Sequence, residues 1–207
     1  MNTHNYLKFL KDEIHSTVFA TIDENGLPVT CVIDIMLADE NGLYFITAKG
    51  KNFYNRLIKN RFVAISGMKG EDTLSSVSIS IRGKVRELGN SLLEKVFQEN
   101  PYMADIYTSY ESRSVLTVFQ LYEGTGEIFD LSKKPIFRDT FSIGNSKEAS
   151  LKYLITNKCT QCGICRKVCP QQCIEKSSPY IINDSNCLHC GKCLEVCPNK
   201  AVERKYV

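Results

Sequence analysis

Apolar and polar residues alternate along much of the first 130 residues, which is the pattern of half-buried β-strands. Runs with this alternation predict strands over 17–23, 27–39, 43–47, 61–68, 74–88, 115–122 and 124–131. Strands that follow one another at such short intervals favour a small β-barrel over a parallel α/β sheet, in which helices would separate the strands.

Two Asn-Gly pairs and two helical segments interrupt these strands. Asn25-Gly26 and Asn41-Gly42 each stand between predicted strands, and such pairs supply the positive φ angles of a tight turn. Apolar residues at helical spacing predict a helix over 51–60 and another over about 90–98.

The overall composition is that of an ordinary soluble globular protein, with 43% hydrophobic and 24% charged residues among 207. A formal net charge of +3 is too small to indicate binding to nucleic acid or to a membrane surface. No apolar run approaches the roughly 18–20 residues that span a bilayer. The first residues, MNTHNYLKFLKDEIHS, lack the apolar core of a secretory signal. We therefore expect a cytoplasmic protein, in which clustered cysteines indicate metal or redox chemistry rather than disulfides.

Nine of the ten cysteines lie after residue 158, in two runs that repeat at a period of 28 residues. CTQCGICRKVCPQQCI begins at Cys159 and CLHCGKCLEVCPNKAV begins at Cys187, and the two align without a gap. Each contains C-x2-C-x2-C-x3-C-P, the cysteine run of a [4Fe–4S] cluster. Zinc also binds C-x2-C pairs, but four evenly spaced cysteines ending in Cys-Pro are not a zinc-finger spacing. The sequence thus predicts two iron–sulfur clusters.

These runs resemble those of bacterial two-cluster ferredoxins, in which the fourth cysteine of each run binds the other cluster. The resemblance assigns one cluster to Cys159, Cys162, Cys165 and Cys197, and the second to Cys187, Cys190, Cys193 and Cys169. Cys173 falls outside both sets, and its counterpart in the second run is Ala201. This favours a buried spare thiol beside the cluster, with an exchangeable ligand or a redox sensor as the alternatives. His189 is expected at the surface, because the cysteines already complete the site.

The same region is basic, with eight Lys or Arg against four Asp or Glu over residues 153–207. Two interpretations of this excess stay open. It offsets the negative charge of the clusters and so favours their reduction, or it marks a docking face for an acidic partner.

The first part of the chain has a characteristic order of elements. A strand, an Asn-Gly turn, a strand and a second Asn-Gly turn are followed by LYFIT, a lysine-containing loop and a helix ending in Asn; a later strand ends in IRGKVREL. Over roughly residues 5–131 this order resembles the FMN-binding split barrel of the pyridoxamine 5′-phosphate oxidase-like superfamily. In that superfamily the flavin lies at a dimer interface, so the resemblance implies a homodimer formed through the barrel.

The resemblance also implies which residues lie around the flavin. The ring would run beside Pro28, Val29, Thr30 and Cys31, the phosphate beside Thr47, Lys49, Lys51 and Asn52, and the flavin edge beside Ser78 and Ser80. Hydroxyl, ammonium and free backbone N–H groups at the start of a helix do bind anions. The alternatives are two solvated lysines in a turn for Lys49 and Lys51, and core packing for Cys31.

The chain departs from true pyridoxamine phosphate oxidases on the second strand, where VTCVIDIM replaces an arginine-rich stretch. It also has no C-terminal basic segment to bind a phosphorylated vitamin. Oxidation of the vitamin is therefore disfavoured. No Ser/His/Asp or Cys/His set is visible, so no catalytic residue is assigned.

We therefore predict a mainly β split-barrel domain over 1–131, a polar linker over 132–152 and a small α+β ferredoxin domain over 153–207. In the ferredoxin domain, a strand over 153–156 is expected to pair with the C-terminus. A flavin exchanges two electrons and a cluster exchanges one, so the fusion would couple two-electron chemistry at FMN to one-electron transfer through two [4Fe–4S] clusters. The leading hypothesis is an FMN-dependent oxidoreductase that acts on a small organic substrate or a redox partner protein. The alternatives are an electron carrier or redox sensor whose barrel binds flavin, deazaflavin or haem without turnover.

Overall fold

The computed structural model describes residues 2–147 and 151–206. The ends of the predicted domains at residues 1 and 207, and residues 148–150 of the predicted linker, lie outside the described residues. The chain divides into two compact units. The first comprises Met1–Lys69, Ser78–Glu127 and Phe141–Lys147, and the second comprises Gly70–Val77, Ile128–Thr140 and Glu148–Val207.

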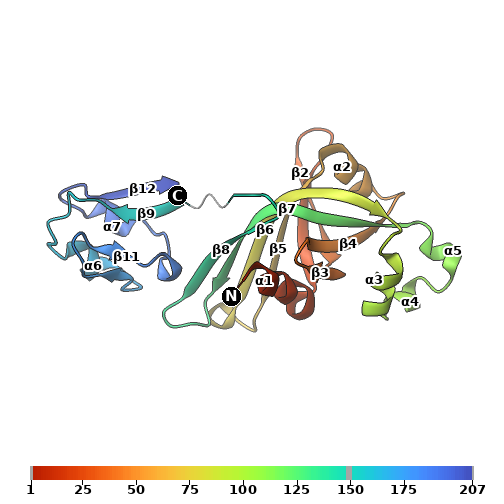
Figure 1. Cartoon of the computed structure of the whole chain (residues 1–207), viewed down its shortest axis with the longest axis horizontal. Helices are drawn as coiled ribbons and strands as arrows, with labels where there is room; N and C mark the ends of the chain where they lie inside the picture. Colours follow the sequence, from red (N-terminus) through yellow and green to blue (C-terminus); the bar gives the residue numbers. More distant parts are fainter. Residues whose placement is uncertain (1, 148–150, 207) are drawn as a thin grey trace. The chain divides into compact units, whose positions relative to one another are not determined.

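An eight-stranded sheet dominates the first part of the chain (Figure 1). Its strands are β1 (Ser16–Ile22), β2 (Pro28–Asp34), β3 (Leu37–Asp39), β4 (Gly42–Ala48), β5 (Phe62–Lys69), β6 (Val77–Gly89), β7 (Leu116–Asp130) and β8 (Phe137–Ile143). They follow the order β2-β1-β5-β6-β7-β4-β3, and β8 also pairs with β7. The strands predicted over 17–23 and 43–47 and both Asn-Gly turns are confirmed. In the first hairpin Phe19 lies opposite Cys31 and Ala20 opposite Thr30.

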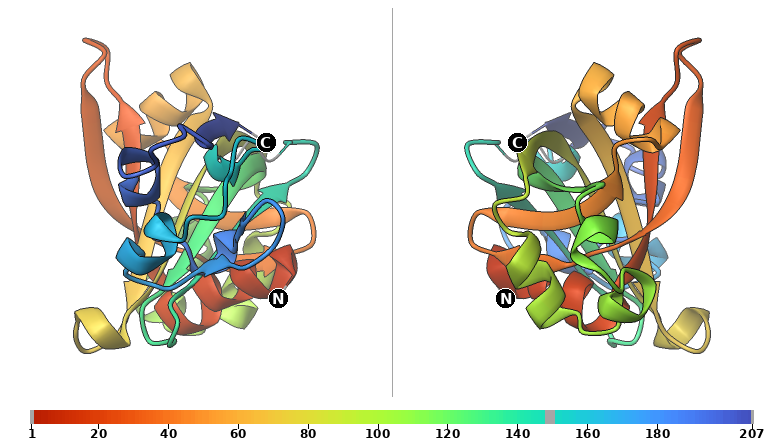
Figure 2. Two further views of the ribbon diagram at one scale, coloured as in Figure 1. Left: turned by 90° about the vertical axis from the view of Figure 1, so that its left-hand side faces the viewer. Right: turned by 90° about the vertical axis from the view of Figure 1, so that its right-hand side faces the viewer.

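Several short helices accompany this sheet. They are α1 (Thr3–Phe9), the π-helical turn η1 (Leu10–Ile14), α2 (Asn52–Asn60), the 3-10 turn η2 (Thr73–Ser75), α3 (Leu93–Glu99), α4 (Met103–Ile106) and α5 (Tyr110–Arg113). The helices predicted over 51–60 and about 90–98 correspond to α2 and α3. Figure 2 shows α3, α4 and α5, in green, gathered at one end of the sheet. In the part of the chain that the structure describes, no helix is long and apolar enough to cross a membrane.

Four predicted boundaries differ from the observed strands. The strand predicted over 27–39 is two strands, because the chain leaves the β1 partner after Asp34 and β3 pairs with β4 instead. The strand predicted from residue 74 begins at Val77, because Asp72 caps the turn η2 by accepting a hydrogen bond from the Ser75 N–H at 2.8 Å. The two strands predicted over 115–131 are one continuous strand, β7. Part of the segment predicted as a linker forms β8.

An aromatic cluster fills the space between the sheet and helix α2. Phe45 packs against Phe19, Phe53 and Phe119, with ring centroids 4.7, 6.1 and 5.7 Å apart. Leu57, one turn after Phe53, is fully buried on the same face of α2. Burial of one such side chain contributes about 1.5–3 kcal/mol, so this cluster fixes α2 against the sheet.

The cysteine-rich region is a small α+β arrangement. Its elements are β9 (Leu151–Ile155), α6 (Ile164–Val168), β10 (Ile174–Glu175), β11 (Ile181–Ile182), η3 (Asp184–Asn186), α7 (Lys192–Glu195) and β12 (Val202–Tyr206). β9 pairs antiparallel with β12, and β10 pairs antiparallel with β11. The predicted pairing of the strand near residue 153 with the C-terminal segment is confirmed.

Candidate functional site

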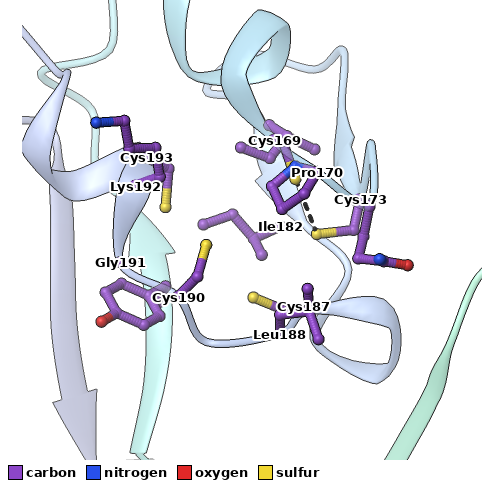
Figure 3. Close-up of a pocket in the computed structure, with 13 residues that line it drawn as sticks. Cys169, Pro170, Cys173, Ile182, Cys187, Leu188, Cys190, Gly191, Lys192 and Cys193 are labelled. Atoms are coloured by element: carbon purple, nitrogen blue, oxygen red, sulfur yellow. Dashed lines mark hydrogen bonds between the residues drawn. The ribbon is translucent and has the colours of Figure 1, made fainter. Parts of the chain in front are cut away.

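Two pockets in the second unit are each lined by cysteines from both repeats. One is lined by Cys159, Cys162 and Cys165 of the first run together with Cys197 of the second run. The other is lined by Cys187, Cys190 and Cys193 of the second run together with Cys169 of the first run (Figure 3). The pockets are nearly equal in size, about 330 and 350 Å³. The structure thus brings together each of the two sets of four cysteines that the sequence suggested.

The backbone around the two pockets repeats with the sequence. Gly163 and Gly191 both have φ 78°, and each directly precedes the short helix that carries the third cysteine of its run. The residues two places before them, Gln161 and His189, also have positive φ. Their backbone N–H groups donate to Cys159 Sγ and Cys187 Sγ, at 3.4 Å in both cases. Such N–H···S bonds stabilise sulfurs that carry negative charge as metal ligands.

The donor set of these pockets fits an iron–sulfur cluster better than a single ion. Burial raises the pKa of the Cys165 thiol, and it raises that of Cys193 to about 11, with neighbouring cysteines adding to the effect. Thiolates this close together, some of them buried, therefore need a cationic partner. Among residues 2–147 and 151–206, no three His, Cys, Asp or Glu side chains converge as a site for one metal ion requires. Thiolates spread around a cavity suit a multi-iron cube.

Cys173 lies in the wall of the second pocket, which therefore contains five cysteines. Its Sγ is 3.5 Å from Cys169 Sγ, as the dashed line in Figure 3 marks. A hydrogen bond from Cys173 lowers the pKa of Cys187 to about 6, while that bond and burial raise the pKa of Cys173 itself. The equivalent position in the other pocket is Ala201.

His189 is less exposed than expected from the sequence. Its side chain is 18% exposed, and its Nε2 lies 2.8 Å from Asp184 Oδ1. The ring also meets Tyr153 edge to face. These contacts hold the loop between Cys187 and Cys190, and no pattern in the sequence indicated them.

The first unit contains a set of residues suited to binding an anion. Thr47, near the end of β4, has a buried Oγ1 without a hydrogen-bond partner in the described part of the chain. Lys49, Lys51 and Asn52 follow it and are exposed. Helix α2 begins at Asn52, and its N-cap, Lys51, makes no side-chain capping bond. The first N–H groups of a helix are free of intrahelical partners, so this end offers N–H donors, two ammonium groups and a hydroxyl.

Strand β2 adjoins this group through Cys31. Burial raises the pKa of the Cys31 thiol, and the nearby positive charges of Arg56 and Lys51 partly oppose that rise. Arg56 Nε also donates to Thr21 Oγ1 at 2.7 Å, and Thr21 lies opposite Val29. Arg56 is not among the residues that the sequence predicted around the flavin. Its position one helical turn after Asn52 was the available signal.

Val29, Thr30 and Cys31 do not share one face of the sheet. Consecutive strand residues alternate, so Thr30 lies on the face opposite to Val29 and Cys31. Ser80 lies on the same face as Thr30, where its Oγ is 3.4 Å from Ser66 Oγ. Ser78, two residues earlier on β6, is half-buried on that face as well. A flavin ring along β2 could therefore not contact all three of these side chains, and it would mainly meet the edge and the backbone of the strand.

The face of the sheet that carries Thr30 is also apolar and exposed. Val32 on β2 lies opposite Val18 on β1, and Val18 lies opposite Ser66 on β5. The exposed apolar side chains on this face are Val18, Ile22, Val32, Phe62 and Met68. Together they cover three adjacent strands.

These features define the class of the molecule: a split β-barrel with helices, followed by a small α+β ferredoxin-like region with two cysteine pockets. Residues 3–127 match the family described as pyridoxamine 5′-phosphate oxidase. The chain therefore belongs to the pyridoxamine 5′-phosphate oxidase family. Residues 147–202 match the family described as 4Fe-4S dicluster domain.

Solved structures show the same fold for the first part of the chain. A NimC/NimA family protein from Clostridium acetobutylicum is 24% identical, with a TM-score of 0.56 over 67% of this chain and 90% of its own. A second C. acetobutylicum protein, related to general stress protein 26, is 17% identical, with a TM-score of 0.52 over 68% and 96%. A haem-binding protein from Mycobacterium smegmatis is 13% identical, with a TM-score of 0.50 over 66% and 56%. No curated protein matches this chain.

Proposed function

We propose that this chain is an oxidoreductase that couples two-electron chemistry at FMN to one-electron transfer through two [4Fe–4S] clusters. The observation that supports it most is the combination of two kinds of site in one chain. Two pockets are each lined by an assigned set of four cysteines, and the barrel has a buried hydroxyl, unpaired within the described residues, beside a basic helix start. A flavin exchanges electrons in pairs and a cluster exchanges them singly, so the two together form a converter.

Each cluster would be held by the cysteines that line one pocket. Cys159, Cys162, Cys165 and Cys197 would bind the first, and Cys187, Cys190, Cys193 and Cys169 the second. The chain's contribution beyond the thiolates is the pair of N–H···S bonds to Cys159 and Cys187, which stabilise negative charge on those sulfurs.

The FMN phosphate would lie at the start of α2. Thr47 Oγ1 would donate to it, Lys49 and Lys51 would neutralise it, and the Asn52 backbone would cap it. The ring would then extend along β2, beside Cys31. Thr30, Ser78 and Ser80 would lie on the opposite face of the sheet, where a second protomer could bring them against its own flavin.

A homodimer through this face is part of the proposal. Its exposed apolar side chains include Val32 at 66% and Met68 at 65% exposure. A contiguous apolar area of this kind indicates an interaction surface. We propose a second copy of the chain as its partner and a small organic molecule or redox protein as the electron-exchange partner. A cytoplasmic location is consistent with free cysteines and cluster ligands.

Cofactor analysis tests the proposal. Anaerobically purified protein is expected to contain about eight irons per chain and one FMN per chain, released on denaturation and identified by mass. About eight irons without flavin, even after FMN is supplied, would contradict the coupled function. If haem or a deazaflavin is recovered instead, that molecule and not FMN is the cofactor of the barrel.

Electron donors separate an enzyme from a non-catalytic carrier or sensor. The bound flavin is expected to be reduced anaerobically by at least one of NADH, NADPH and reduced ferredoxin, and reoxidised by an organic acceptor or redox protein. A flavin that stays oxidised with all three donors would favour the carrier or sensor.

A further inference from the structure

The two cysteine pockets differ at one position, and the difference is a thiol. Gln172 and Lys200 occupy equivalent positions, both with positive φ, and they lead into Cys173 in one pocket and Ala201 in the other. Ala201 is 1% exposed, and its N–H donates to Cys197 Sγ at 3.2 Å. The first pocket therefore has four cysteines, and the second has five.

Cys173 Sγ lies beside Cys169 Sγ in the wall of the second pocket. The two sulfurs are 3.5 Å apart, and a tight turn closed by a 3.1 Å bond from Gln172 N–H to Cys169 O brings their backbones together. Cys173 also contacts Cys187, the first cysteine of the second run. Figure 3 shows its sulfur directed toward Cys169 and the pocket rather than away from it.

Burial argues against the redox-sensor alternative. Sensor cysteines are solvent-accessible, so that oxidants can reach them. Cys173 is 7% exposed, and its backbone is fixed by a 2.8 Å bond from Asn183 N–H to Cys173 O. A buried thiol directed at a ligand sulfur is placed to act on the cluster.

We propose that Cys173 is a reserve ligand of the second cluster, able to replace Cys169 as its fourth thiolate. This rests on the proposed iron–sulfur function of the pocket. In the exchange, the bond from iron to Cys169 Sγ breaks and a bond from iron to Cys173 Sγ forms. The thiol proton of Cys173 passes to the departing Cys169 sulfur. No electron is gained or lost, and the total charge of cluster and ligands is unchanged.

Iron content of matched variants tests the exchange. Cys169→Ala is expected to keep about eight irons per chain, because Cys173 takes over, whereas Cys197→Ala, with Ala201 beside it, keeps about four. Cys169→Ala/Cys173→Ala is expected to fall to about four, and Cys197→Ala/Ala201→Cys to recover to about eight. A Cys169→Ala protein with the same iron loss as Cys197→Ala overturns the proposal. Unaltered protein without iron would instead refute the cluster function itself.

A second measurement does not depend on the folding of the Cys169 variant. Cys173→Ala leaves all eight assigned ligands in place. Its iron is expected to pass to a chelator in two phases, and one of these phases should be several-fold faster than in the unaltered protein. The reason is that a transiently opened Cys169 bond then has no second thiol to close it. Equal rates in both proteins would refute the reserve role.

Discussion

Gly83 of β6 and Gly124 of β7 lie against each other with no space for a side chain. A Cβ on Gly83 would come within 2.4 Å of the Glu123 carbonyl oxygen and 2.9 Å of Gly124 Cα. Gly83→Ala is therefore expected to separate the strands locally and to destabilise the barrel by about 1–3 kcal/mol. Chemical unfolding measures the loss.

Gly50→Ala is the matched control. A Cβ at Gly50 meets no atom within 4 Å. Its free energy of unfolding is expected to stay within about 0.5 kcal/mol of the unaltered protein. Equal stabilities for the two variants would show that β6 and β7 are not held this closely.

This contact explains one failure of prediction from sequence. The sequence predicts two strands here, over 115–122 and 124–131, and the second has Gly124 and Gly126 near its start. In the structure both glycines lie within a single strand, β7, where the β6 backbone beside Gly124 and the Phe141 ring beside Gly126 leave no space for a Cβ. A glycine in a sequence can mark either a turn or a close contact within a strand. Which of the two applies at Gly124 depends on β6, a strand some forty residues earlier in the chain.

The cysteine pockets were predictable for the opposite reason. The spacing within each run and the 28-residue repeat are visible in the sequence, and Gly163 and Gly191 at equivalent positions have the same φ of 78°. The resemblance to two-cluster ferredoxins assigns the fourth cysteine of each pocket to the other run. Hydrophobic alternation likewise located most strands. The position of Arg56 one helical turn after Asn52 indicates the face of α2 on which it lies, but its contact with Thr21 was not predictable, because Thr21 is on a distant strand.

The residues proposed to bind the FMN phosphate at the start of α2 give a prediction about flavin binding. Lys51→Ala removes a charge-assisted contact worth about 1.5–3 kcal/mol, so FMN affinity is expected to fall roughly 10–100-fold. Thr47→Val is expected to weaken FMN about 2–10-fold. Because the Thr47 hydroxyl is buried without a hydrogen-bond partner among residues 2–147 and 151–206, the same change should leave the flavin-free protein as stable as before or more stable.

Fluorescence titration with FMN measures these affinities. Lys59→Ala, in the last turn of the same helix, is the matched control and should bind FMN normally. If Lys59→Ala and Lys51→Ala weaken binding equally, the phosphate does not lie at the start of α2.

Tyr44 gives the barrel a defined alkaline pH dependence. Burial, together with the hydrogen bonds to Asp39 at 2.9 and 3.0 Å, raises the pKa of Tyr44 from 10.0 to about 12. Between pH 10 and 12 the unfolded chain loses this proton and the folded chain keeps it. The free energy of unfolding therefore falls, by up to about 1.4 kcal/mol per pH unit from this group alone.

Tyr44→Phe removes this contribution. Urea unfolding at pH 9, 10 and 11 should show the variant less stable at pH 9, with the difference shrinking as the pH rises. Tyr110→Phe, at a position 83% exposed, controls for loss of a phenol. A constant difference between Tyr44→Phe and the unaltered protein over this range would contradict the assignment.

The apolar face of β1, β2 and β5 gives a prediction about assembly. Val32→Glu places a charge within the proposed dimer interface, and its desolvation should shift the protein to monomers at micromolar concentration. Light scattering measures the mass. Leu74→Glu, an exposed apolar position in η2, should keep the assembly of the unaltered protein. Dimers that survive Val32→Glu would place the interface elsewhere.

An anaerobic reductive titration followed by visible absorption tests the coupling of flavin and clusters most directly. The unaltered protein is expected to take up about four electrons per chain, two with bleaching of the flavin bands and one for each cluster. Reoxidation by a strictly one-electron acceptor should then return all of them, including the pair held by the flavin. Uptake of only about two electrons, with no change in the flavin bands, would contradict the account.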